Sequence, residues 1–159
     1  MFELLHQKVL EAIPLSDDEF NSCKTLFQPK KLRRKRFLLG EEDVCRYIAF
    51  VEKGLLRSYV IDDKGAEHVL QFSLEGWWVS DLSSFLTGEP SRFNIEALED
   101  CELLMISKSG WDDLLAMIPI LERFFRILIQ NNRIVTQRRL LASFMDTAEE
   151  QYHKLILRF

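Results

Sequence analysis

The chain has 159 residues, of which 47% are hydrophobic and 29% charged, and its formal net charge is −4. This length suits one domain of ordinary size with an extension, and the composition excludes both a disordered chain and a membrane-spanning one. The acidic balance also argues against a DNA-binding surface on this segment, because such surfaces need concentrated positive charge. The first residues carry Glu3 and no basic leader, so we expect a cytoplasmic protein without a membrane partner.

The first 27 residues are predicted to form two short helices. Apolar residues recur every three or four positions in the first, which Pro14 ends: Phe2, Leu5, Val9 and Ile13. Ser16 and Glu19 are three apart, the spacing of a capping box, and predict a second helix that runs to about Phe27.

From Lys31 to Ser107 the sequence predicts antiparallel strands of a sandwich or barrel. Runs with period-two alternation are separated by glycine turns, and no strand–helix–strand alternation appears that would indicate a parallel sheet. The predicted strands are Lys31 to Leu39, Tyr47 to Lys53, Leu55 to Ile61, Glu67 to Phe72, Phe93 to Leu98 and Glu102 to Ser107.

A basic run from Lys30 to Arg36 begins this region. Such a run occurs in nucleic-acid and targeting patches. Lysines also guard the edges of sheets against unwanted strand addition. We interpret the run as a solvated edge strand.

The three cysteines, Cys23, Cys45 and Cys101, are odd in number, widely spaced and without a C-x-x-C pair. This pattern predicts reduced, structural thiols and no metal site.

After Ser107 the pattern returns to helix, first through Trp111 to Met117 and then in a long helix that Pro119 opens and that runs to about Phe144. The long helix is apolar on two faces, and only one of them can pack on a small barrel. The other predicts a homodimer seam. The residues expected in this seam are Leu121, Phe125, Leu128, Asn131, Asn132 and Val135. Thr147 and Glu150 then cap a last helix, which we expect to continue into a further domain.

The most specific motif is the stretch Tyr47 to Tyr59, a hydrophobic strand, a glycine turn at Gly54 and a return strand with Arg57. It is followed by Gly76 to Leu82, by Phe85 to Arg92 and by Ile95 to Leu98. With the long helix, these motifs resemble the Crp/Fnr family of bacterial transcription regulators. The resemblance implies an α+β fold, an antiparallel β-roll of the cyclic nucleotide-binding type with N-terminal helices and a long C-terminal dimerisation helix.

The same resemblance implies a division of the chain into three parts. Residues 1–118 would be the sensor domain, 119–145 the dimerisation helix, and 146–159 the start of a connection to a winged helix-turn-helix that is absent from this chain. The partners implied are a second copy of the chain, DNA through that absent domain, and a small anionic effector.

Residues 80–92, here called the cassette segment, lie where relatives that bind cyclic nucleotides have Gly-Glu-Leu and, further on, Arg-Ser/Thr-Ala. Amides at a helix start, an arginine and a glutamate hold phosphate and ribose there. In this chain Ser80-Asp81-Leu82 replaces the first motif, Ser91 stands at the arginine position, and Arg92 is displaced by one residue. A shift of one residue turns a strand side chain to the opposite face.

We therefore expect cyclic AMP to bind poorly, and we predict no cofactor and an effector of unknown identity. If an effector binds, its anionic group is expected at the amides near Ser80 to Ser84, with charge supplied by Arg92 or Arg57. The full candidate pocket is Trp78, Ser80, Asp81, Leu82, Ser83, Ser84, Ser91, Arg92 and Arg57.

Two other classes of protein are alternatives to a regulator. A metal-dependent cupin enzyme needs two or three converging histidines, and only His68 lies on a predicted strand, so no catalytic or metal-binding residues are predicted. His68 is expected to be a surface strand residue or to be hydrogen-bonded. A stand-alone interaction module that has lost its ligand remains the alternative, since the cassette departures fit it equally.

Overall fold

A computed structural model describes residues 1–131, and a first unit within it spans Met1–Leu121. Two helices, α1 (Glu3–Ala12) and α2 (Asp17–Lys24), precede the strands. The strands are β1 (Gln28–Leu32), β2 (Phe37–Leu39), β3 (Tyr47–Lys53), β4 (Leu56–Ile61), β5 (Glu67–Ser73), β6 (Trp78–Val79), β7 (Asn94–Ala97) and β8 (Cys101–Ser107). Helix α3 (Leu82–Thr87) lies between β6 and β7, and α4 (Lys108–Met117) follows β8.

The capping box predicted for the second helix is confirmed. The Ser16 hydroxyl accepts a hydrogen bond from the Glu19 amide, and the Glu19 carboxylate accepts one from the Ser16 amide, both at 3.1 Å. The two bonds satisfy amides that the helix start leaves without partners. Helix α1 is held by Glu52 of β3, whose carboxylate accepts a hydrogen bond from the Leu5 amide at 3.1 Å.

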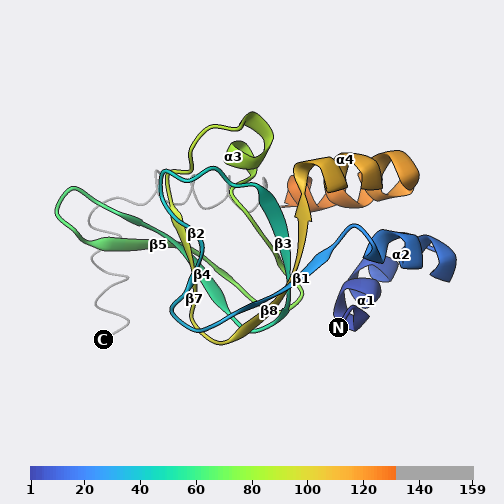
Figure 1. Cartoon of the computed structure of the whole chain (residues 1–159), viewed down its shortest axis with the longest axis horizontal. Coiled ribbons are helices and arrows are strands. Elements are labelled where there is room, and N and C mark those ends of the chain that lie inside the picture. The colour runs from blue at the N-terminus through green and yellow to red at the C-terminus, as the bar shows by residue number, and fades with distance from the viewer. Residues whose placement is uncertain (132–159) are drawn as a thin grey trace, which may run out of the picture. The chain divides into compact units, whose positions relative to one another are not determined.

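Two four-stranded antiparallel sheets form the roll (Figure 1). One has the order β1-β8-β3-β6 and the other the order β2-β7-β4-β5. Both sheets contribute core side chains that are almost fully buried: Phe50, Leu56, Ile95, Leu103, Leu104 and Ile106. The predicted α+β fold with an antiparallel β-roll is confirmed.

The prediction of one strand from Lys31 to Leu39 is wrong. The structure has two strands there, β1 in the first sheet and β2 in the second, joined by a turn over residues 33–36. Lys35 in this turn adopts a left-handed conformation, with φ of 69°. The basic run is therefore only in part an edge strand: its exposed Lys30 and Lys31 belong to β1, which does form an edge of its sheet.

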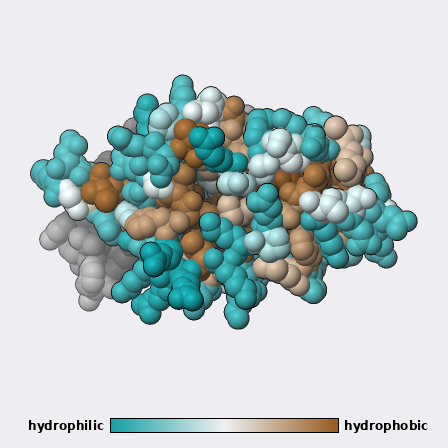
Figure 2. Space-filling view, in the orientation of Figure 1, coloured by the Kyte–Doolittle hydropathy of each residue, from teal (hydrophilic) through white to brown (hydrophobic). Residues whose placement is uncertain are grey.

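The hairpin of β3 and β4 turns at Gly54, as predicted. Its φ of +105° favours glycine, and a Cβ there would lie 2.6 Å from the Cys101 sulfur and 2.9 Å from the Asp100 carbonyl oxygen. The β4–β5 hairpin projects from the roll (Figure 1). Figure 2 shows hydrophobic surface on this projecting end. Four hydrophobic side chains of the hairpin are about half exposed: Ile61, Val69, Leu70 and Phe72.

The helix predicted after Pro119 begins at residue 120 and is helical to the last described residue, 131. A second unit starts at residue 122. Within it the rings of Phe124 and Phe125 make an edge-to-face contact, with centroids 5.2 Å apart. Of the residues predicted for the dimer seam, Leu121 and Phe125 are buried, Leu128 is half-buried and Asn131 is exposed. Asn132, Val135, the predicted helix end near Phe144 and the predicted last helix lie outside the described residues.

No helix within residues 1–131 combines the length and the hydropathy needed to cross a membrane.

Candidate functional site

The cassette segment begins with Asp81 at the N-terminus of α3. Its Oδ1 accepts a hydrogen bond from the Ser84 amide at 3.1 Å, and so caps the helix. Aspartate is favoured at this position because its short side chain reaches the amides that the first turn leaves without partners. Gly88, with φ of 79°, ends the helix in a left-handed conformation.

The second carboxylate oxygen of Asp81 binds another residue of the same segment. Oδ2 accepts a hydrogen bond from the hydroxyl of Ser91 at 2.7 Å, and both side chains are buried. The hydroxyl of Ser91 in turn accepts a hydrogen bond from the Phe93 amide at 3.3 Å. The acid and the serine that stand at the expected ribose and phosphate positions therefore bind one another.

The cassette segment also holds the loop of residues 40–46 in place. Ser84 Oγ accepts a hydrogen bond from the Cys45 amide at 2.8 Å. The Glu42 amide donates to the Ser91 carbonyl at 2.7 Å, and the Ser91 amide donates to the Asp43 carbonyl at 2.8 Å. The polar groups of the segment thus support a neighbouring loop.

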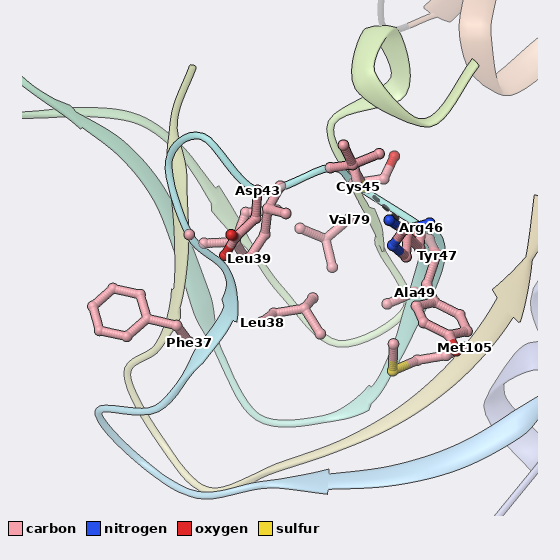
Figure 3. A pocket seen from close by; sticks show the side chains of 14 residues that line it. Phe37, Leu38, Leu39, Asp43, Cys45, Arg46, Tyr47, Ala49, Val79 and Met105 are labelled. Carbon is pink, nitrogen blue, oxygen red and sulfur yellow. Dashed lines mark hydrogen bonds between the residues drawn. The ribbon is translucent and has the colours of Figure 1, made fainter. Parts of the chain in front are cut away.

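That loop forms one wall of a cavity of about 620 Å³ inside the roll (Figure 3). This volume lies within the range of about 300 to 1,000 Å³ that small-molecule pockets occupy. The cavity is lined by residues of both sheets and of the loop, namely Phe37, Leu38, Leu39, Gly40, Asp43, Val44, Cys45, Arg46, Tyr47, Ala49, Val79, Ser80, Ile95 and Met105.

Only one of the nine residues predicted for the pocket, Ser80, lines the cavity. Trp78 lies on β6, where its ring contacts Phe50 edge-on at a centroid distance of 5.1 Å and Phe27 at 6.2 Å. Leu82 is half-buried and Ser83 is exposed on α3. The structure brings Asp81, Ser84 and Ser91 together, but as a hydrogen-bonded cluster beside the cavity.

The two arginines expected to supply charge lie in different surroundings. Arg57 on β4 pairs with Glu67 and Glu96, each at 2.9 Å, and its guanidinium stacks on the ring of Tyr59 with the carbon 4.1 Å from the centroid. The hydrogen bond that Arg57 donates to the Glu67 carboxylate raises the pKa of the guanidinium. Arg92 is exposed and forms no ion pair with another residue of the range 1–131.

The lining residues other than Ser80 were missed from the sequence, and one signal could have indicated them. Ala49 lies between Ile48 and Phe50 on a strand that is buried on both faces, and its side chain is fully buried. A small residue on an inward face leaves space unless a larger neighbour fills it. Here the space stays open between Ala49, Val79 and Met105 (Figure 3).

His68 and the three cysteines occupy positions that indicate structural roles. His68 is exposed on β5, and its Nε2 lies 2.8 Å from Asp62 Oδ2, as expected of a hydrogen-bonded surface residue. Cys23, Cys45 and Cys101 are buried and unpaired by disulfides. Within residues 1–131, no cluster of three histidine, cysteine or acidic side chains is arranged to hold a metal ion.

The sequence profile of the cyclic nucleotide-binding domain matches residues 29–117. The fumarate and nitrate reduction regulatory protein of Vibrio cholerae is 26% identical over 140 residues, which are 86% of this chain and 54% of that protein. The human patatin-like phospholipase domain-containing protein 6 is 29% identical over 120 residues, 75% of this chain but only 8% of that protein. The chain thus spans about half the length of the regulator it matches and a small part of the phospholipase.

Among solved structures, a cyclic nucleotide-binding domain from Methylobacillus flagellatus superposes with a TM-score of 0.73 at 19% identity. The alignment covers 89% of this chain and 83% of that one. At this identity the superposition shows a shared fold.

Proposed function

Since the chain belongs to the cyclic nucleotide-binding domain family, we propose that it is the effector-sensing and dimerisation portion of a Crp/Fnr-type transcription regulator. The observation that carries this proposal is the match to the Vibrio cholerae regulator, which extends over 86% of the chain. The order of helices, β-roll and long helix supports it. Residues 1–118 are assigned to the sensor and 119–145 to the dimerisation helix.

In this proposal two chains pair along residues 119–145, and DNA is contacted by a domain outside these 159 residues. The net charge of −4 supports that assignment, because DNA-binding surfaces need concentrated positive charge. An effector bound to the roll would favour one packing of the two long helices and so re-aim the attached recognition helices. The protein would act in the cytoplasm.

The effector is proposed to be something other than cyclic AMP. The Asp81 carboxylate accepts hydrogen bonds from Ser91 and Ser84 within its own segment. A ribose hydroxyl would have to displace the Ser91 hydroxyl, and the phosphate would find serine where relatives have arginine. The residues of the cassette segment therefore do not fit a cyclic nucleotide.

A mobility-shift experiment with DNA tests the regulator proposal. The product of the complete gene and residues 1–159 are incubated with genomic fragments at about 150 mM salt, where nonspecific attraction has weakened. We expect selection of particular sequences by the gene product and no selection by residues 1–159. Sequence-specific binding by residues 1–159 would place the DNA contact on this chain instead.

The second candidate function is an interaction module, and the projecting β4–β5 hairpin favours it. Ile61, Val69, Leu70 and Phe72 expose apolar surface there, and β5 is an edge strand. Exposed apolar patches of this kind mark contact sites for other proteins. Failure of the complete gene product to select DNA, with capture of a protein partner that Phe72→Asp abolishes, would favour the module.

A further inference from the structure

We propose that the cavity inside the roll binds a small organic monocarboxylate with an apolar body. This inference deepens the proposed sensing function, on which it rests, by naming a class of effector and its site. The position differs from the cassette amides at which an anion was expected, because only Ser80 is shared between them.

The lining of the inner part of the cavity favours a ligand with an apolar body. Its lining there comes from strands of both sheets and is hydrocarbon or thioether: Leu39, Ala49, Val79, Ile95 and Met105. A nucleoside would place ribose hydroxyls and base edges against these groups, and the loss of their hydrogen bonds to water would go uncompensated. An aliphatic or aromatic group is the occupant that this lining favours.

The residues at the opening of the cavity favour a carboxylate as the charged group of the ligand. Arg46 lines it, is exposed, and has no ion pair with any side chain in the described part of the chain. A guanidinium matches a carboxylate in geometry, with two parallel hydrogen bonds. Because Arg46 is not engaged by the protein's own carboxylates, as Arg57 is, it can bind a carboxylate from outside.

A second charge at the opening limits the ligand to one negative charge. Asp43 lines the cavity and lies across from Arg46, with Val79 between them (Figure 3). Its carboxylate would repel a dianionic phosphate monoester more than a carboxylate, since like charges at close range disfavour one another. The pair therefore selects a monoanion.

The wall that carries both charges is tied to the cassette segment. Asp43 and Cys45 are bonded through their main chains to Ser91 and Ser84. The Glu41 amide donates to the side chain of Asn94 at 2.8 Å. A ligand that displaces this wall would therefore also displace α3. Binding in the cavity would then change the conformation of the cassette segment at the surface of the roll.

Calorimetric titration of residues 1–159 with three probes that share one apolar body tests the proposal. The probes are 4-phenylbutyrate, 4-phenylbutan-1-ol and 4-phenylbutylamine. We expect the carboxylate to bind about tenfold more tightly than the alcohol, as a charge-assisted hydrogen bond with Arg46 allows, and more tightly than the amine, which Asp43 attracts but Arg46 repels. No detectable binding of the carboxylate, or equal affinity for all three probes, would overturn the proposal.

Two variants locate the site. Arg46→Gln is expected to weaken the binding of 4-phenylbutyrate about tenfold and to leave the affinity for the alcohol unchanged. The control Arg33→Gln removes an exposed arginine in the β1–β2 turn and should leave both affinities unchanged. Ala49→Leu narrows the inner end of the cavity and is expected to weaken binding of every probe while the melting transition persists. Because Arg46 is exposed, its variant tests the proposal even where Ala49→Leu does not fold. Equal losses in Arg46→Gln and Arg33→Gln would place the anion elsewhere.

The binding result is separate from the regulator proposal. Sequence-specific DNA binding by the complete gene product, combined with no binding of 4-phenylbutyrate, would contradict the proposed effector class and support the regulator function. Binding of the carboxylate without any DNA binding would support the effector class and contradict the regulator function.

Discussion

The hydroxyl of Ser91 donates a 2.7 Å hydrogen bond to the buried carboxylate of Asp81, ten residues earlier in the chain. In relatives that bind cyclic nucleotides, these two positions hold an acid and an arginine that contact the ligand. In this chain the pair closes upon itself and, with Ser84, supports the loop of residues 40–46. The polar groups of the cassette segment thus bind one another beside a cavity that remains open.

Ser91→Ala is expected to lower the free energy of unfolding by about 2 kcal/mol, because a buried carboxylate loses a hydrogen-bond donor. Urea denaturation measures the loss. Ser83→Ala is the matched control, since its side chain is exposed on α3, and its effect should stay within about 0.5 kcal/mol. Equal effects of the two substitutions would show that the bond between Ser91 and Asp81 contributes nothing particular to stability.

Gly54→Ala is expected to destabilise the protein far more than Gly65→Ala. Both glycines have positive φ, so alanine is strained at either position. Only at Gly54 would the added Cβ also meet the Cys101 sulfur and the Asp100 carbonyl, whereas nothing lies within 4 Å at Gly65. Thermal unfolding of the two variants measures the difference. A melting temperature for Gly54→Ala equal to that for Gly65→Ala would contradict the close packing at this turn.

The three cysteine thiols should be nearly unreactive in the folded protein. Burial raises the pKa of Cys23 to about 11 and raises the pKa values of Cys45 and Cys101 as well. At pH 8 about 0.1% of Cys23 is then thiolate, against about a tenth in the unfolded chain. Ellman's reagent at pH 8 is expected to label the thiols only after urea is added. Rapid labelling of the native protein would contradict the burial.

The raised pKa of Cys23 also predicts how the stability of the protein depends on pH. The folded pKa of Cys23 is raised above its ordinary value of 9.0, so the native state holds this proton more tightly than the unfolded state. The associated stability is fully present below pH 9 and is lost as the pH rises toward 11. Cys23→Ala should flatten the fall in melting temperature over this range, and an unchanged slope would contradict the assignment.

The hairpin of β3 and β4 and the capping box of α2 could be predicted from the sequence because their signals are local. Gly54 lies between two alternating strands, and Ser16 and Glu19 are three residues apart. The division of Lys31 to Leu39 into β1 and β2 could not be predicted, because Lys35 takes a left-handed conformation that its residue type does not indicate. Strand β6 has only two residues and leaves no period to detect.

The candidate site was harder to predict than the fold. Sequence spacing indicated that Ser91 stands where relatives have arginine, but the bond from Ser91 to Asp81 depends on how the segment between them folds. The cavity is formed where β2, β3, β7 and β8 meet the loop, and such a meeting has no local pattern. Nothing in the sequence around Arg46 distinguishes it from other surface arginines, because its place at the opening depends on the fold.

Residues 119–145 are expected to pair two chains in solution. Light scattering at micromolar concentration should give about twice the 18.8 kDa mass of one chain. Leu128→Asp should shift the protein toward the monomer, because it places a charge in the predicted seam. Gln130→Asp, at an exposed position outside that seam, should leave the dimer intact. A monomer for the unaltered chain would count heavily against this assignment.

We propose that the hydrogen bond between Asp81 and Ser91 closes the cyclic-nucleotide cassette of this chain. Calorimetric titration of residues 1–159 with cyclic AMP tests it most directly. We expect no saturable binding tighter than about 100 μM, because the Asp81 carboxylate already accepts hydrogen bonds and Ser91 stands where relatives have arginine. Submicromolar affinity for cyclic AMP would contradict it.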